Sequence, residues 1–402
     1  MSAAETEIKA ERNHVEHASP LSNDATEGEK DIVFNNEGDH VVVTDEDVSF
    51  FLYPALFTSL SAGYGTNGVA TVIGSLCVFG LGHIHSTVLF SYQIIFLVFG
   101  LITVITAPII YLALDNSVAS ARFLTLDDRL KGVERLRSNN TGIVSTTFKW
   151  SQVGEMCLDL KTIPFIAMTL FVNVGASTSN VFGPLILQGI AGFTASNTTL
   201  LNVPFGVLQV IVILSASYVA FKTKTKSTVF IGYMIPVVVG AALLYSLPHS
   251  KKNEGPLLLG YYLLAFLFAA NPIIISWIAA NVGGQTKKAS FFCLYNAASS
   301  AGNIVGPQLF KEKDAPSYKS GLQAVLGIFC ALIGIIVIQA LILAFLNRRK
   351  EAQRVKNGKP AKLHDLSMDT EFDNTAAIDA QLGANAFKDQ TDGENDEFVY
   401  VL

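Results

Sequence analysis

Amide and hydroxyl side chains stand at regular intervals inside long apolar stretches of this sequence. They form three sets: Asn173, Ser177 and Asn180; Asn296, Ser299, Ser300 and Asn303; and Asn271, which directly precedes Pro272. Intervals of three and four residues place the members of a set on one face of a helix. Such a face can bind a polar solute in a cavity or hydrogen-bond to a neighbouring helix. On the first interpretation, the substrate-binding residues are Asn173, Ser177, Asn180, Asn271, Asn296 and Asn303.

The same stretches lack the side chains that most enzymes use. No Asp, Glu, Lys or Arg occurs between residues 50 and 114, and the acidic residues between 162 and 346 fall in short polar breaks. The four cysteines have neither a CxxC spacing nor a nearby histidine cluster, which argues against a disulfide framework and a metal site. A nucleophile, an acid–base pair and a metal cluster are therefore missing. We expect no enzyme activity and no cofactor.

Four further residues have structural interpretations. Gly302 and Gly306 are four residues apart, which suits close helix packing better than ligand contact. Pro272 cannot donate a backbone hydrogen bond, so it frees a carbonyl in mid-stretch and predicts a kink. Asn281 lies near the end of its apolar stretch, and we expect it to structure the following loop.

Composition indicates that these stretches cross a membrane. Half of the 402 residues are hydrophobic and only 15% are charged, against about 25% in soluble domains. Uncharged apolar runs of about 20 residues can span a bilayer as helices, and a soluble core rarely places such runs back to back. We expect an all-α, polytopic membrane protein with spans near residues 68–88, 92–114, 164–188, 200–221, 229–247, 257–280, 291–309 and 322–346.

Polar segments divide the chain into five expected parts. They are a disordered cytoplasmic tail (1–49), a partial N-terminal transmembrane bundle (50–114), a cytoplasmic central loop (115–161), a C-terminal six-helix transmembrane bundle (162–346) and a cytoplasmic tail (347–402). The apolar stretch 50–62 is too short to span and indicates a damaged or partial helix. Within the central loop, helical spacing predicts a short amphipathic helix around residues 127–137.

Basic residues set the expected orientation. Lys and Arg cluster in residues 121–150 and recur in alternate breaks near 222–226, 287–288 and 348–350, whereas the break at 191–199 has none. Basic loops stay on the cytoplasmic side. The central loop and the C-terminus are therefore expected inside.

Acidic residues near the C-terminus permit a weak second hypothesis. Asp392, Glu394, Asp396 and Glu397 loosely suggest a calcium loop. Their spacing and the position of the glycine do not fit an EF-hand. We therefore interpret them as a solvated acidic tail.

Several motifs follow one another in the order found in a known family. They are Ala121-Arg122-Phe123-Leu124-Thr125, Asp128-Arg129 and Val133-Glu134-Arg135-Leu136-Arg137 in the central loop, then Asn281-Val282-Gly283-Gly284-Gln285-Thr286-Lys287-Lys288, Gly302-Asn303-Ile304-Val305-Gly306-Pro307-Gln308, and Thr391-Asp392 with Glu394-Asn395 and Phe398. Over about residues 50–402 the sequence resembles the fungal anion:cation symporters of the major facilitator superfamily, nearest to allantoate permease-like members.

The resemblance implies both a fold and a function. Family members have twelve spans, and about the first three have no counterpart in this sequence, so we expect an N-terminally truncated member with an incomplete major facilitator fold. The implied function is proton-coupled symport of a small organic anion, such as a ureido acid or nicotinate, by alternating access at the plasma membrane. The implied partners are the organic anion, protons and the lipid bilayer, without nucleic acid. The alternative is a non-transporting truncated paralogue or a membrane interaction protein.

Overall fold

The computed structural model describes residues 31–33, 40–42, 65–84, 89–113, 148–191, 195–248, 251–311, 314, 318–361 and 389–402. The expected amphipathic helix near 127–137 and the short stretch 50–62 lie outside these residues. The described helices, beside one at Gly65–Gly82, are α3 (Ser91–Ala113), α5 (Trp150–Leu158), α6 (Thr162–Ala191), α7 (Ala195–Thr223), α8 (Lys226–Ser246), η3 (Lys251–Asn253), α9 (Glu254–Leu263), η4 (Leu264–Ala269), α10 (Ala270–Asn281), α11 (Gln285–Gln308) and α12 (Lys319–Lys356).

The expected all-α membrane fold is confirmed. In the part of the chain that the structure describes, seven helices are long and apolar enough to cross a membrane, and each matches an expected span. The eighth expected span, 291–309, lies in α11 except for its last residue, and α11 is a helix of 24 residues that is less apolar than the others. Its composition follows from the polar set at residues 296–303.

Two short strands lie outside all of these spans. β1 (Asp31–Val33) and β2 (His40–Val42) pair antiparallel, with Ile32 opposite Val41. They fall within residues 1–49, most of which lie outside the described residues. The interpretation of that segment as a disordered tail therefore stays a prediction.

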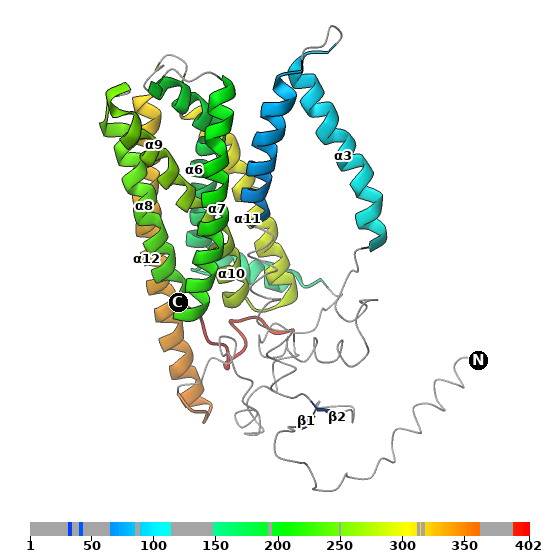
Figure 1. The fold of residues 1–402 in the computed structure, drawn as a ribbon. Helices are drawn as coiled ribbons and strands as arrows, with labels where there is room; N and C mark the ends of the chain where they lie inside the picture. The colour runs from blue at the N-terminus through cyan, green and yellow to red at the C-terminus, as the bar shows by residue number, and fades with distance from the viewer. Residues whose placement is uncertain are drawn as a thin grey trace, which may run out of the picture.

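Helices α6 to α12 pack as one bundle around α6 (Figure 1). α6 and α11 approach each other closely. A Cβ atom on Gly302 would lie 2.7 Å from the carbonyl oxygen of Leu170, and one on Gly306 would lie 2.6 Å from that of Val174. Only glycine permits this separation, so the expectation that Gly302 and Gly306 serve helix packing is confirmed.

One span of the bundle changes its helix type midway. Residues Glu254–Asn281 form α9, the 3₁₀ segment η4 and α10 in succession. Pro272 in the first turn of α10 has no N–H to offer the carbonyl of residue 268, within η4. A 3₁₀ segment therefore ends three residues before Pro272, and the expected kink itself stays a prediction.

The two N-terminal helices stand beside this bundle as a separate pair (Figure 1). The helix Gly65–Gly82 contacts α7 where Gly68 and Gly206 face each other, since a Cβ on either would lie within 3.0 Å of the other's carbonyl oxygen. α3 has no buried residue within its span. Among the residues that the structure describes, the pair therefore packs on the bundle through the helix Gly65–Gly82.

Candidate functional site

Two of the predicted substrate-binding residues lie in interhelical contacts. Asn173 on α6 is buried, and its Nδ2 donates to Thr169 O at 2.8 Å and to Asn271 Oδ1 at 3.5 Å. Ser177 is also buried, and its Oγ donates to the backbone oxygen of Asn303 on α11 at 3.3 Å. These contacts join α6 to α10 and to α11, which favours the structural interpretation for Asn173 and Ser177.

Asn271 lies at the centre of a small polar cluster. It is half-buried at the start of α10, and its Oδ1 accepts from Tyr295 Oη at 3.1 Å and from Asn173 Nδ2. Tyr295 is on α11, so the cluster joins three helices. The amide oxygen of Asn271 is engaged twice, which orients its amide nitrogen away from these two donors.

The other three predicted residues are exposed on the bundle. Asn180 lies on α6, whereas Asn296 and Asn303 lie two turns apart on α11. Asn296 Nδ2 donates to Phe292 O at 2.9 Å, and Asn303 Nδ2 donates to Ser299 O at 3.1 Å. An amide nitrogen carries two hydrogens. Each of these two amides therefore keeps one N–H and its Oδ1 for a further partner.

A groove with a mostly apolar lining and a few hydroxyl and amide groups lies where the N-terminal helix pair meets the bundle. It has a volume of about 370 Å³ and lies between the helix Gly65–Gly82 and α7, where Thr71, Ser75, Thr199 and Asn202 line it. Nearby, Thr71 Oγ1 donates to Gln209 Oε1 at 3.3 Å. None of the six predicted residues lines this groove.

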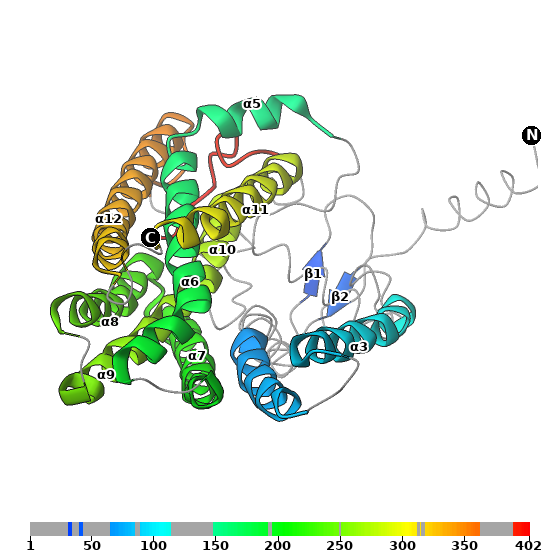
Figure 2. The same ribbon diagram turned by 90° about the horizontal axis from the view of Figure 1, so that it is seen from above.

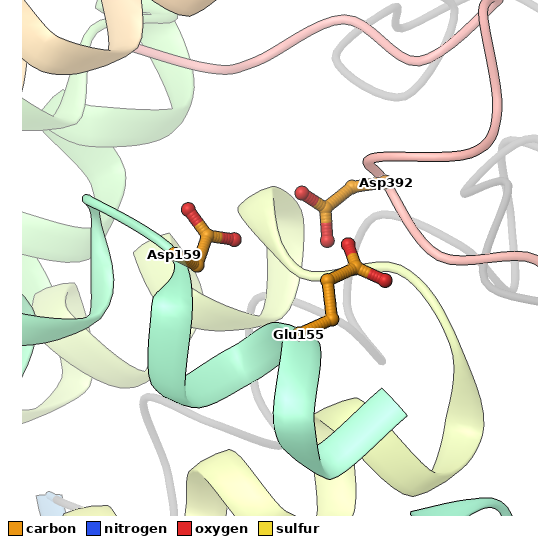
Figure 3. A group of neighbouring side chains, drawn as sticks. All are labelled: Glu155, Asp159 and Asp392. Carbon is orange, nitrogen blue, oxygen red and sulfur yellow. The ribbon is translucent and has the colours of Figure 1, made fainter. Parts of the chain in front are cut away.

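A second concentration of polar groups lies at the end of the bundle where α5 and the C-terminus meet (Figure 2). Glu155 and Asp159 come from α5 and its C-terminal end, and Asp392 comes from the last fourteen residues of the chain (Figure 3). Their carboxylate oxygens lie within 4.8 Å of one another, close enough to share a metal ion.

Lysine side chains enter this carboxylate group, which we name the charge cluster. Lys287 Nζ lies 2.9 Å from oxygens of Glu155, Asp159 and Asp392. Lys161 Nζ pairs with Asp159 at 2.6 Å and also with Asp392. Both lysines are fully buried. Two ammonium groups already neutralise most of the negative charge, so the geometry indicates an ion-pair network rather than a metal site.

The charge cluster corrects one interpretation from the sequence. Asp392 is 1% exposed and Glu397 is also buried, so these two residues are not part of a solvated tail, whereas Glu394 is exposed. Burial would raise the pKa of Asp392, but the charges of Lys161 and Lys287 outweigh burial and lower the pKa to about 2. The carboxylate is therefore ionised throughout the physiological pH range.

Curated proteins of related sequence are fungal transporters. The chain is 32% identical to an uncharacterized transporter of Schizosaccharomyces pombe, over 84% of the chain and 59% of that relative. It is 33% identical to an MFS-type transporter of Penicillium expansum, over 77% of the chain and 63% of the relative. It is 25% identical to the allantoate permease of Saccharomyces cerevisiae, over 86% of the chain and 61% of the relative. The chain is a homologue of fungal major-facilitator-type transporters.

The expected relationship to fungal transporters is therefore confirmed. These homologues are named as transporters or permeases, so the expectation that the chain is not an enzyme is supported by its relatives. The chain spans between 59% and 63% of the length of these three relatives. No protein-family model matches it.

Tyr295 and the groove residues were missed by reasoning from the sequence. Many transporters bind their solute between two helical halves near the middle of the membrane. In a homologue of transporters, both Tyr295 and the residues that line the groove are therefore relevant to solute binding. Tyr295 directly precedes Asn296, and Thr71 and Ser75 are four residues apart, a spacing that could have singled them out. Asn281, by contrast, does not structure the α10–α11 turn, because its amide pairs with the backbone of Val401.

Proposed function

We propose that the chain forms part of a transporter that moves a small organic anion, such as a ureido acid or nicotinate, inward with protons across the plasma membrane. Its homologues are named as transporters, and one of them is an allantoate permease. The chain itself forms a multi-pass membrane protein by the length and composition of its helices. Alternating access between two helical parts is the mechanism that such folds use.

The polar face of α11 carries this proposal. Asn296 and Asn303 are exposed on a helix that is less apolar than the other spans, and each keeps an amide N–H for a ligand. A free amide is costly in contact with lipid, so this face suits a wet cavity. Amide N–H groups donate to carboxylate and ureido oxygens, and hydrogen bonds to a charged group are the stronger ones.

The position of α11 agrees with this role. In the view along the helices, α11 lies on the side of the bundle toward the N-terminal helix pair (Figure 2). The groove lined by Thr71 and Asn202 also lies between the helix Gly65–Gly82 and α7. Next to the exposed Asn296, the hydrogen bond from Tyr295 to Asn271 joins α11 to α10. A solute between the two parts would contact side chains from both.

The test is uptake of radiolabelled allantoate and nicotinate by yeast that lacks its own transporters for them. Because the chain is shorter than its relatives, it is assayed alone and joined behind the first spans of the allantoate permease. Asn296→Ala and Asn303→Ala are expected to raise the apparent KM by roughly tenfold, since each removes a hydrogen bond to a charged group. Asn253→Ala serves as a control, because Asn253 lies outside the spans and donates to Pro248.

Three results would count against the proposal. Unchanged kinetics in both α11 variants at normal expression would reassign these amides to a structural role. Uptake that does not respond to external pH would contradict proton coupling. Failure of both the chain and the joined protein to take up either compound would favour the alternative, a non-transporting membrane protein that interacts with other proteins.

A further inference from the structure

The last fourteen residues of the chain cross one end of the bundle as a continuous, docked segment. We name residues 389–402 the strap, which Figures 1 and 2 show in red against α5, α10, α11 and α12. At its start, Asp389 pairs with Lys149 at 2.8 Å. At its end, the backbone oxygen of Leu402 accepts from the backbone N–H of Lys226 at 2.6 Å. The strap therefore connects α5 to the start of α8.

Side-chain amides of the bundle bind the backbone of the strap. Asn281 accepts from Val401 N at 2.9 Å and donates to Val401 O at 3.0 Å. Asn347 does the same for Tyr400, at 2.8 and 2.7 Å. Each amide thus makes the pair of hydrogen bonds to the strap backbone that a neighbouring strand of a sheet would make. Proteins commonly hold an extended peptide by such backbone hydrogen bonds.

Buried cations recognise the acidic part of the strap. Asp392 pairs with Lys161 and Lys287 in the charge cluster and accepts from the backbone N–H of Gly283 at 3.1 Å. Lys350 donates to the backbone oxygens of Gly393 and Asn395, both at 2.8 Å. The acidic strap and the lysines that bind it are therefore complementary in charge. This complementarity fixes the register of the strap.

The two buried lysines of the charge cluster keep carboxylate partners when the strap is taken away. Without Asp392, Lys161 still pairs with Asp159, and Lys287 still pairs with Glu155 and Asp159. Two cations then share two carboxylates, both from α5 and its end. Neither lysine is left buried without a counter-ion, which is the situation that makes removal of a buried charge prohibitive. The surface that binds the strap can therefore exist without it.

We propose that this end of the bundle is a peptide-binding site whose ligand is the chain's own residues 389–402, held reversibly. The strap is then a ligand tethered through residues 362–388 rather than a fixed part of the fold. When bound, it ties α5, α8, the α10–α11 turn and α12 together, and when released it leaves their ends free to move separately. This inference concerns a second site and does not depend on the proposed transport function.

The experiment uses the full chain with a specific protease site inserted within residues 362–388. The purified protein is cut in its folded state, and retention of the strap is measured by size-exclusion chromatography and mass spectrometry. A fluorescent synthetic peptide of residues 389–402 is then added in excess, and its binding is followed by anisotropy. The strap is expected to remain after cleavage and to exchange with the peptide.

Peptide variants test recognition without altering the protein. An Asp392→Asn peptide is expected to bind the cut wild-type protein at least roughly tenfold more weakly, because it loses the ion pairs of Asp392 with Lys161 and Lys287. A Glu394→Gln peptide is the matched control, because Glu394 is exposed and accepts from Thr391 within the strap itself. That peptide is expected to bind like the wild type.

Three outcomes would overturn the proposal. Immediate loss of the strap on cleavage would show that the site has no affinity of its own. A strap that stays but never exchanges with excess peptide would be a permanent part of the fold. Equal binding of the Asp392→Asn and Glu394→Gln peptides would show that the charge cluster does not recognise the segment.

Discussion

Replacement of Gly302 by alanine should loosen the contact between α6 and α11. The added Cβ would lie 2.7 Å from Leu170 O, where ordinary contact begins at 3.4 Å, so the helices must separate locally by about 0.7 Å. Overpacking of this kind costs about 1–3 kcal/mol. Alanine also stabilises the helix by up to about 1 kcal/mol through its higher helix propensity. The substitution must therefore be compared with a Gly→Ala substitution at a position where a Cβ meets no neighbour.

Gly327 on α12 supplies that control, because nothing lies within 4 Å of a Cβ placed there. Both substitutions gain the same helix propensity, so the difference between Gly302→Ala and Gly327→Ala isolates the close contact. We expect Gly302→Ala to melt roughly 2–10 °C lower than Gly327→Ala, measured in detergent by loss of the monodisperse size-exclusion peak after heating. Equal melting temperatures, or a higher one for Gly302→Ala, would refute the packing argument.

Three further predictions follow from the strap and from the orientation of the chain. The docked pKa of Asp392 is about 2, below its ordinary 3.8, so the ionic contribution of Asp392 to docking is complete above about pH 4 and is lost as pH falls toward 2. Retention of the cleaved strap should be constant from pH 7 to 5, below the pKa of about 8 to which burial lowers Lys350, and should fall below pH 4. Retention that does not fall below pH 4 would contradict this. Gly283→Ala should weaken peptide binding roughly tenfold, because its Cβ would lie 2.7 Å from Asp392 N, whereas Gly255→Ala, with open space, should leave binding unchanged. A tag after Leu402 should be protected from external protease in intact cells, while a tag inserted at residues 195–199 should be cut; the reverse pattern would show the opposite orientation.

Most of the membrane fold could be predicted from hydropathy alone. A span is a local property of about 20 consecutive residues, so each apolar run predicts its own helix. The exception is instructive, because α11 forms the expected helix at 291–309 although its composition is too polar for an ordinary span. The polar set at residues 296–303 lowers its hydropathy and also gives the helix its proposed function.

The substrate face was only partly predictable, for a geometric reason. Spacing shows which residues share a helix face, but it does not show what that face meets. Asn173 and Asn303 belong to sets with the same periodicity, yet Asn173 is buried against Asn271 while Asn303 is exposed. The surroundings of each amide depend on the packing of α6 against α11, which no local pattern encodes.

The strap could not have been found from composition. Residues 389–402 are acidic and follow a long polar segment, which is typical of a solvated tail. The lysines that bury Asp392 lie far away in the chain, with Lys161 separated from it by 231 residues. α5 is also short, with nine residues. Both elements are defined by tertiary contacts rather than by their own sequence.

The two proposed sites are connected through α11. Its first turns carry Lys287, which holds the strap through Asp392, and its later turns carry Asn296 and Asn303 on the proposed substrate face. Because Gly302 and Gly306 leave no space between α11 and α6, these two helices must move as one unit. A docked strap ties the same unit to α8 and α12. Any tilt of α11 that opens or closes the substrate face must therefore move together with the strap or break its contacts.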